Sequence, residues 1–423
     1  MKAIVRALTH KSIRSSATTN LRASGGAPVS GITASDNFEG ASQASAEVLE
    51  GMNSAFEDIV IGDDTRGALN TQLQRLDDRA SQFANSSLDF CESKEPWSCN
   101  RQEASLIALA WACAANVYDH GTDLQRDLEH AGTRLNVEWS LPASSLGSAK
   151  ATTFTTYTPE PEASDNSRPA PYLTIAVRGS ATKLDHIVNL NGDPRLGGDL
   201  FPDESIRINA HAGFLNSALR LLPLLSGQIE QRLRDTPSTT LLFTGHSAGG
   251  ATATLLYLAF RSRFAKRYPN AAFTCITFGC PPVAKAISRQ DENTLNQIAI
   301  QDNVINIMNE FDFVTRADST YFRSLIQLYQ HVDEAPSSAV WALPPQQLQH
   351  VGAVVVLRKE IPGFEIGTDA QGNTCLRLSA WKLTPESLAQ VMFCRLSVHG
   401  RIEYQKRMAQ IENGALSEHG GWS

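Results

Sequence analysis

One serine of this sequence stands where a turn between a strand and a helix would expose its hydroxyl group. Ser247 lies in the run TGHSAGG (244–250), between an apolar β-prone segment and an apolar segment of helical character. Such a sharp turn strains the backbone at its apex and requires nearly absent side chains two positions away. Gly245 and Gly249 meet this requirement, and together with His246 they form the predicted nucleophile elbow. Ser247 is therefore predicted to be a catalytic nucleophile.

The same turn predicts part of a site for negative charge. A helix that begins directly after Ser247 directs the amide of Ala248 and the positive end of its dipole toward charge that develops beside the serine. Half of an oxyanion hole would thus come with the turn. The alternative is a glycine-rich turn that caps an ordinary strand-helix unit, since the pentapeptide GxSxG alone is a weak signal.

A serine hydroxyl needs a histidine to take its proton and a carboxylate to orient that histidine. When the serine stands on such a turn, the acid and then the histidine follow it in the chain. Asp312 comes just after the apolar segment 304–308, at the end of a predicted strand where active-site loops of parallel sheets gather. Asp312 is the predicted acid, and Glu310 and Asp318 are its nearby alternatives.

Four histidines follow Asp312 in the chain, namely His331, His350, His399 and His419. His419 lies in a glycine-rich end and His331 follows a polar helical stretch, so both are poor candidates for the base. His350 precedes a predicted strand at 351–357, whereas His399 lies in a loop after a helix. Position along the chain leaves these two open.

The segments around these residues predict an α/β fold. Short apolar strands alternate with helices, which implies a mostly parallel central sheet with helices on both faces. The predicted strands lie at 152–157, 172–177, 272–278 and 304–308, and the clearest helices at 104–114 and 251–260.

Composition excludes several classes of function. A net charge of −7 argues against a nucleic-acid surface, and no apolar run approaches the ~18 residues that a membrane helix needs. The seven cysteines are an odd number without CxxC pairs or clusters typical of metal sites, so most are expected to be buried thiols in a reducing compartment. Cys91 and Cys99 could form a disulfide only in an exported protein.

The chain divides into four predicted parts. Residues 1–36 form a basic tail, with a mitochondrial transit peptide as the alternative; 37–100 form a polar helical extension; 101–410 form the catalytic domain; and 411–423 form a flexible tail. No apolar signal-peptide core follows the N-terminal charges, so secretion is disfavoured. An intracellular, cytoplasmic location is favoured, with the mitochondrion as the alternative.

Six further motifs make residues 103–408 resemble the class 3, or fungal-type, lipases of the α/β-hydrolase superfamily. Beside the elbow they are RGS at 178–180, HAGFL at 211–215, TFGCP at 277–281, DFV at 312–314, HVG at 350–352, and His399 with Tyr404 five residues later. The sequence departs from the family at Ala248, where leucine is common, and at Thr315, where proline is common.

The resemblance implies roles that position alone does not assign. It makes His399 the catalytic base and His350 a structural residue, and it places the second oxyanion donor at Ser180 beside Ala248. It also implies an amphipathic lid after Ser180, for which a plain surface helix is the alternative reading. The apolar face of this lid would consist of Leu184, Ile187 and Val188.

Together these features predict a serine carboxylic-ester hydrolase that acts on lipid esters through an acyl-enzyme on Ser247. An acylglycerol lipase working at a membrane or lipid-droplet surface is the favoured form. A phospholipase or short-chain esterase with the same triad and a non-catalytic lipase-like scaffold or binding protein are the alternatives. The chemistry requires no metal or organic cofactor, and the pattern predicts no oligomeric state.

Overall fold

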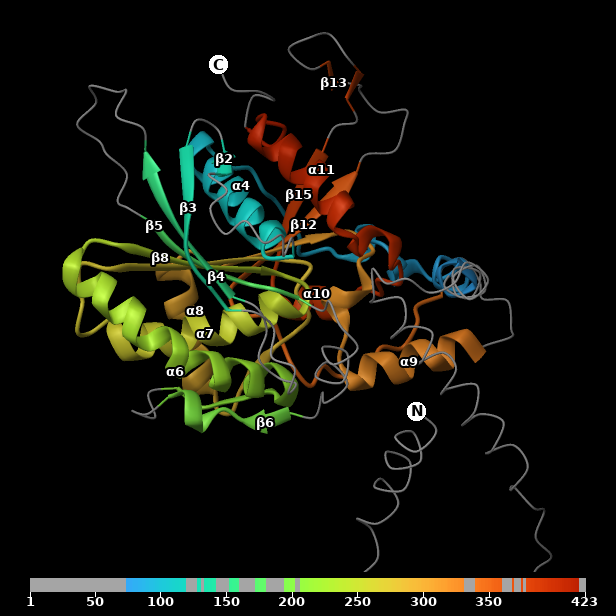
Figure 1. Cartoon of the computed structure of the whole chain (residues 1–423). Helices are drawn as coiled ribbons and strands as arrows, with labels where there is room; N and C mark the ends of the chain where they lie inside the picture. Colours follow the sequence, from blue (N-terminus) through green and yellow to red (C-terminus); the bar gives the residue numbers. More distant parts are fainter. Residues whose placement is uncertain are drawn as a thin grey trace, which may run out of the picture. The chain divides into compact units, whose positions relative to one another are not determined.

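The computed structural model describes residues 74–118, 128–130, 133–141, 152–159, 172–179, 194–201, 206–330, 339–359, 367–368, 374–375 and 378–417 (Figure 1). All of them belong to the second of two compact units of the chain, which spans Phe56–Ser423. The fold below is that of this unit.

Its centre is a sheet of ten strands among the described residues, in the order β1-β15-β12-β11-β9-β8-β5-β4-β3-β2. The five strands in the middle, from β12 to β5, run parallel to one another, and the strands on both flanks are antiparallel. This confirms the predicted α/β fold with a parallel central sheet. The strands are β1 (Glu95–Pro96), β2 (Leu128–His130), β3 (Thr133–Leu141), β4 (Thr152–Pro159), β5 (Tyr172–Val177), β8 (Thr240–His246), β9 (Ala272–Phe278), β11 (Ile305–Asn309), β12 (Ala353–Lys359) and β15 (Leu378–Leu383).

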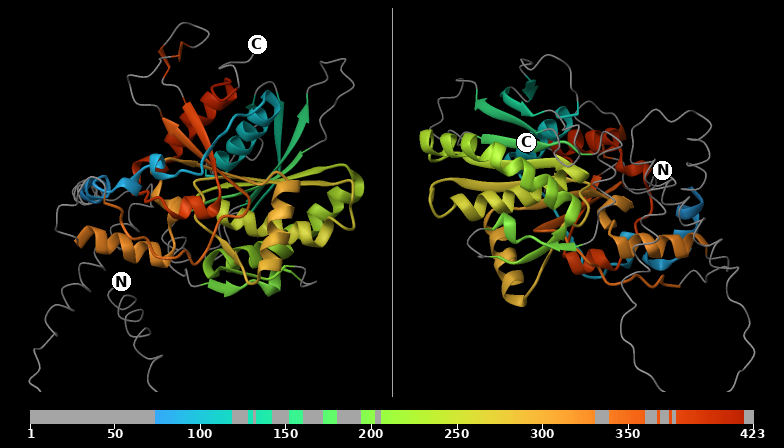
Figure 2. Two further views of the ribbon diagram at one scale, coloured as in Figure 1. Left: turned by 180° about the vertical axis from the view of Figure 1, so that it is seen from behind. Right: turned by 60° about the horizontal axis from the view of Figure 1, so that its bottom comes forward.

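Helices cover both faces of this sheet (Figures 1 and 2). Helices α6 (Ala212–Asp235) and α7 (Ala248–Phe264) pack on one face, and α4 (Arg101–Asn116) and α11 (Arg401–Glu412) on the other. Strand β8 contributes side chains to the hydrophobic cores on both faces of the sheet, because successive side chains of a strand point to opposite faces. Leu241 and Phe243 pack in the core with α6 and α7, and Leu242 packs in the core with α4 and α11. Every residue of α7 from Ala248 to Phe260 is buried, which is typical of a helix at the centre of a domain.

Smaller elements complete the unit. Strands β6 (Pro194–Leu196), β7 (Ile208–His211) and β10 (Ala284–Ala286) form a second sheet, and β13 (Gly367–Thr368) pairs with β14 (Thr374–Cys375). Among the described residues, the further helices are α8 (Arg289–Gln301), α9 (Ser319–Gln330) and α10 (Pro385–Ala389), and residues 74–80 are helical as well. The short 3₁₀ helices are η1 (Ala84–Ser86), η2 (Leu88–Phe90), η3 (Gly198–Leu200), η4 (Phe313–Arg316) and η5 (Ser397–His399).

Segments at both ends of the described region pack into this unit. Strand β1 pairs with β15, and Leu88 packs in a core cluster with β11 and β12, so residues before 101 already belong to the compact unit. At the other end, α11 extends to Glu412, and Ile411 and Leu416 are buried. A few apolar residues in otherwise polar segments make these contacts, which is why composition gives little sign of them.

Candidate active site

Ser247 occupies the turn between β8, which ends at His246, and α7, which begins at Ala248. Its backbone has φ 57° and ψ −134°, a region that residues other than glycine rarely adopt. Such a conformation costs about 1–3 kcal/mol and persists only where the surroundings enforce it. Here the Ser247 amide donates to the Phe278 carbonyl at 2.8 Å, which fixes the turn against the end of β9.

The two glycines beside Ser247 leave no room for a side chain. A Cβ atom on Gly249 would collide with the Val177 carbonyl and lie 2.6 Å from the Gly179 amide nitrogen. A Cβ atom on Gly245 would lie 2.5 Å from the carbonyl carbon of Gly249. The tight turn therefore requires glycine at both positions, as the sequence pattern predicts.

Three side chains that lie far apart in the sequence meet at this turn. The Ser247 Oγ lies 3.0 Å from His399 Nε2, and His399 Nδ1 lies 2.9 Å from Asp312 Oδ2 and 3.1 Å from Asp312 Oδ1. All three residues are buried, and Asp312 fully so. Because a carboxylate only accepts hydrogen bonds, Nδ1 carries the proton and Nε2 is free to accept from the serine hydroxyl. Ser247, Asp312 and His399 are thus brought together with the connectivity of a catalytic triad.

The Asp312 carboxylate has further donors around it. The Tyr404 hydroxyl donates to Oδ2 at 2.7 Å and the Val314 amide to Oδ1 at 3.0 Å, while the Asn309 amide donates to the Tyr404 oxygen at 3.0 Å. Burial and the neighbouring Asp312 raise the pKa of Tyr404 well above its usual value, so this hydroxyl stays protonated and donates. The sequence pattern identified Tyr404 only as a member of a motif, and its contact with the acid emerges from the fold.

His246 supports His399 from the other side. Its Nε2 donates to the His399 carbonyl at 3.0 Å, and the two rings stack with centroids 4.7 Å apart. Burial lowers the pKa of His246 well below 6.5, and the nearby His399 lowers it further, so the His246 ring is neutral. Two consecutive residues of the elbow therefore contact the same histidine, Ser247 at its ring and His246 at both its ring and its backbone carbonyl.

Part of the predicted oxyanion hole lies within the described residues. Ala248 is the first residue of α7, so its amide belongs to the helix N-terminus, where amides lack partners within the helix. Gly179 passes directly beside the elbow, since β5 pairs with β8 in parallel. The second predicted donor, Ser180, and the predicted lid residues Leu184, Ile187 and Val188 lie outside the described residues.

The alternative acids and the alternative base make other contacts. His350 Nε2 donates to the Thr315 carbonyl at 2.8 Å, where it supports the turn after Asp312. Glu310 accepts from the Leu88 amide, and Asp318 accepts from the Tyr321 amide. In the described part of the chain, none of the three is hydrogen-bonded to Ser247 or His399.

The buried His350 makes stability depend on pH. Burial lowers the pKa of His350 from 6.5 to about 4, so between these values the unfolded chain binds a proton that the folded protein does not. The contribution of His350 to the free energy of unfolding is therefore complete above pH 6.5 and is lost as the pH falls to 4. We expect this loss to be about 2–3 kcal/mol.

Chemical denaturation at pH 7 and pH 4 measures the effect in the wild type and in His350→Gln, whose amide can still donate to the Thr315 carbonyl. The variant should lose about 2–3 kcal/mol less than the wild type between the two pH values. An equal loss in both proteins would show that His350 does not contribute.

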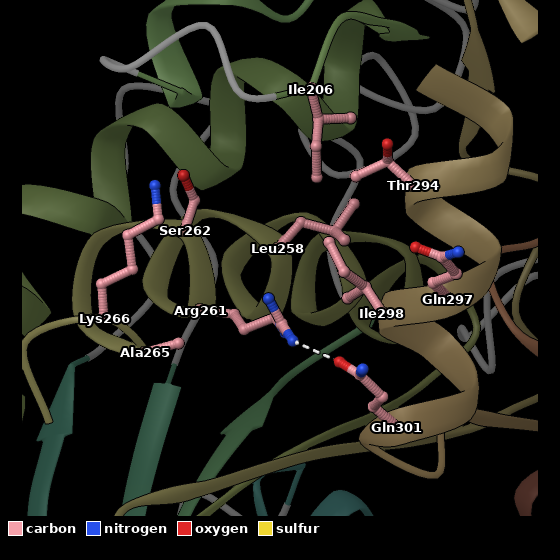
Figure 3. A pocket seen from close by; sticks show the side chains of 10 residues that line it. All are labelled: Ile206, Leu258, Arg261, Ser262, Ala265, Lys266, Thr294, Gln297, Ile298 and Gln301. Atoms are coloured by element: carbon pink, nitrogen blue, oxygen red, sulfur yellow. Dashed lines mark hydrogen bonds between the residues drawn. The ribbon is translucent and has the colours of Figure 1, made fainter. Parts of the chain in front are cut away.

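A hollow of about 240 Å³ lies elsewhere in the unit, between α7 and α8 (Figure 3). Leu258 and Ile298 form part of its wall, and Arg261 donates to Gln301 at 3.2 Å across it. The helix rise places Leu258 about 16 Å along α7 from Ser247. This hollow shares no residue with the candidate site.

The described residues contain no group of three or more side chains arranged to hold a metal ion. Among these same residues, no helix combines the length and the apolar character needed to cross a bilayer.

A parallel sheet with a serine on a strand-turn-helix elbow, followed in the chain by an aspartate and a histidine that contact it, defines the α/β-hydrolase class. Residues 174–322 match the family model described as Lipase (class 3). This match covers the part of the chain that holds Ser247 and Asp312, and it is to the family that the motifs predict.

The chain is also similar to individual proteins. Protein EDS1L and Protein EDS1 of Arabidopsis thaliana are each 32% identical to it over 94 residues, which is 22% of this chain and 15% of each relative. The match thus spans only a small part of these relatives.

Among solved structures, a triacylglycerol lipase with a serine protease triad is 18% identical, covering 72% of this chain and 96% of that chain with a TM-score of 0.46. The Yarrowia lipolytica LIP2 lipase is 13% identical, covering 74% and 97% with a TM-score of 0.47.

Proposed function

We propose that this protein is a serine carboxylic-ester hydrolase that acts on lipid esters, with acylglycerols as its main substrates. The observation that carries the proposal is the hydrogen-bonded chain from Ser247 Oγ through His399 to Asp312, built on a strained elbow. A turn that only connected a strand to a helix would need none of these partners. The class 3 lipase match over the same residues favours lipid esters as substrates.

In the proposed reaction, Ser247 Oγ attacks the ester carbonyl while His399 Nε2 takes its proton. The Ala248 amide, together with Ser180, holds the negative charge of the tetrahedral intermediate. His399 then gives the proton to the departing alcohol, which leaves an acyl-enzyme on Ser247. Water, deprotonated by His399, releases the acid and restores the serine.

The proposed substrates are presented at a membrane or lipid-droplet surface, where a lid with Leu184, Ile187 and Val188 on its apolar face would open. We place the protein inside the cell, in keeping with the free buried thiols of Cys91 and Cys99. The same triad would serve a phospholipase or a short-chain esterase, because chain length and head group are selected by the shape of the pocket. Titration of the acid released should give higher rates for acylglycerols than for phospholipids or short-chain esters.

A fluorophosphonate probe tests the nucleophile directly, since it forms a covalent bond with an activated serine. We expect the wild type to be labelled and Ser247→Ala to remain unlabelled. Ser226→Ala is the matched control, because within the described residues the Ser226 hydroxyl donates to the Leu222 carbonyl inside α6, and it should be labelled like the wild type. If folded wild-type protein failed to react, the proposal would be wrong and a non-catalytic binding or scaffold role would take its place.

A further inference from the structure

The turn that carries Asp312 is strained at the preceding residue. Phe311 has φ 71°, which is unfavourable for a bulky side chain and costs about 1–3 kcal/mol that other contacts must offset. The position of the Asp312 carboxylate depends on this conformation, because Phe311 sets the direction in which the chain leaves β11. The contacts of Phe311 are therefore relevant to the acid.

Arg395 makes two contacts with Phe311 and one with Phe313. Its amide donates to the Phe311 carbonyl at 2.8 Å, its carbonyl accepts from the Phe313 amide at 3.4 Å, and its guanidinium lies 4.1 Å from the centre of the Phe311 ring. The backbone of Arg395 thus pairs with both neighbours of Asp312, and its side chain covers the strained residue. A guanidinium above an aromatic ring adds about 0.5–2 kcal/mol of attraction.

Asp77 also contacts the Arg395 guanidinium. Arg395 Nε donates to Asp77 Oδ2 at 2.7 Å, and the Asp77 side chain is only 20% exposed. A hydrogen bond of this length between charged groups is stronger than one between neutral groups. Asp77 lies 318 residues from its partner and outside the region that matches the class 3 family.

The same N-terminal segment also holds Glu310, two residues before the acid. The buried Glu310 carboxylate accepts from the Leu88 amide at 2.9 Å and from Arg358 Nε at 3.0 Å. Arg358 in turn donates to both oxygens of Asp89. Asn85, also buried, accepts from the Met392 amide at 2.7 Å through its carbonyl and donates from its side chain to the Gln390 carbonyl at 3.3 Å, on the stretch that leads to Arg395.

We propose that residues 77–91, here called the N-terminal clasp, are a positioning element that holds the Asp312 carboxylate in line with His399. The clasp contacts both residues that precede Asp312, Phe311 through Arg395 and Glu310 directly. It acts through these neighbours and touches none of the three residues of the triad by a hydrogen bond in the described part of the chain. The expected effect of the clasp on rate rests on the proposed function. The hydrogen bond between Asp312 and His399 that the clasp maintains can be observed without turnover.

Asp77→Asn tests the clasp, because it removes the charge and keeps the shape of the side chain. With a soluble ester we expect kcat to fall about tenfold and KM to change less than about twofold, since misplaced catalytic groups cost rate rather than substrate binding. Asp77→Glu, which keeps the charge, should retain most of the activity. Glu230→Gln is the control: Glu230 is similarly buried and pairs with Arg267 beyond the far end of α7, and its kcat should match the wild type.

A second readout requires no turnover. The His399 Nδ1 proton that bonds to Asp312 gives a low-field proton NMR resonance, which should broaden or disappear in folded Asp77→Asn and persist in Asp77→Glu and Glu230→Gln. If the wild type hydrolyses no ester and reacts with no fluorophosphonate, the proposed function fails. The resonance still tests whether the clasp positions Asp312 against His399. An unchanged kcat and resonance in Asp77→Asn, or a loss of kcat that only follows the loss of folded protein, would overturn the clasp.

Discussion

Replacing His399 by alanine is expected to lower kcat by about 10⁴- to 10⁶-fold, whereas His350→Gln should keep kcat within about tenfold of the wild type. The reason is geometric. His399 Nε2 lies 3.0 Å from Ser247 Oγ and its Nδ1 contacts Asp312, so without this ring the serine keeps its proton. His350 contacts the Thr315 carbonyl and supports the chain after the acid.

The measurement is the rate of ester hydrolysis at saturating substrate, with circular dichroism as the check that each variant is folded. Gln is the matched change at position 350 because its amide nitrogen can replace His350 Nε2 as the donor to the Thr315 carbonyl. A folded His350→Gln without activity, beside a fully active His399→Ala, would exchange the two assignments.

Asp312→Asn is expected to lower kcat by about 10⁴-fold while the protein remains folded. An asparagine amide at this position donates to His399 Nδ1 and leaves the proton of the neutral ring on Nε2, which then cannot accept from Ser247. Tyr404→Phe should have a much smaller effect, about tenfold or less, because it removes one donor to the carboxylate and leaves the carboxylate itself.

The alternative carboxylates provide the control for this assignment. Asp318→Asn changes a carboxylate that accepts from the Tyr321 amide, and it should keep most of the wild-type activity. Glu310→Gln changes a carboxylate that accepts from the Leu88 amide of the clasp and from Arg358, so its loss should be far smaller than that of Asp312→Asn. Activity of Asp312→Asn close to that of the wild type, combined with a large loss in either control, would assign the acid to the other residue.

Local sequence signals were sufficient for the elbow and the strands. The glycines beside Ser247 and the apolar runs at β5, β8, β9 and β11 are each encoded within a few neighbouring residues, so their structures could be predicted without knowledge of the rest. The order of Ser247, Asp312 and His399 along the chain follows from the same architecture.

The choice between His350 and His399 could not be made from position alone. Both follow the acid, and only packing determines that α11 and the preceding turn bring residue 399 to the elbow while residue 350 lies against Thr315. The contacts that position Asp312 could not be predicted from the sequence for a similar reason. Asp77 and Arg395 are 318 residues apart, and neither belongs to a motif.

The amino-acid sequence by itself determined which residues could do chemistry, because residue type, glycine spacing and strand periodicity are local properties. Only the tertiary structure decided which of them meet and what holds them, because contacts between distant residues depend on the packing of the whole sheet and its helices. That packing unites Ser247 with His399 and Asp312, stacks His246 against the base, and ties Asp77 to the turn that carries the acid.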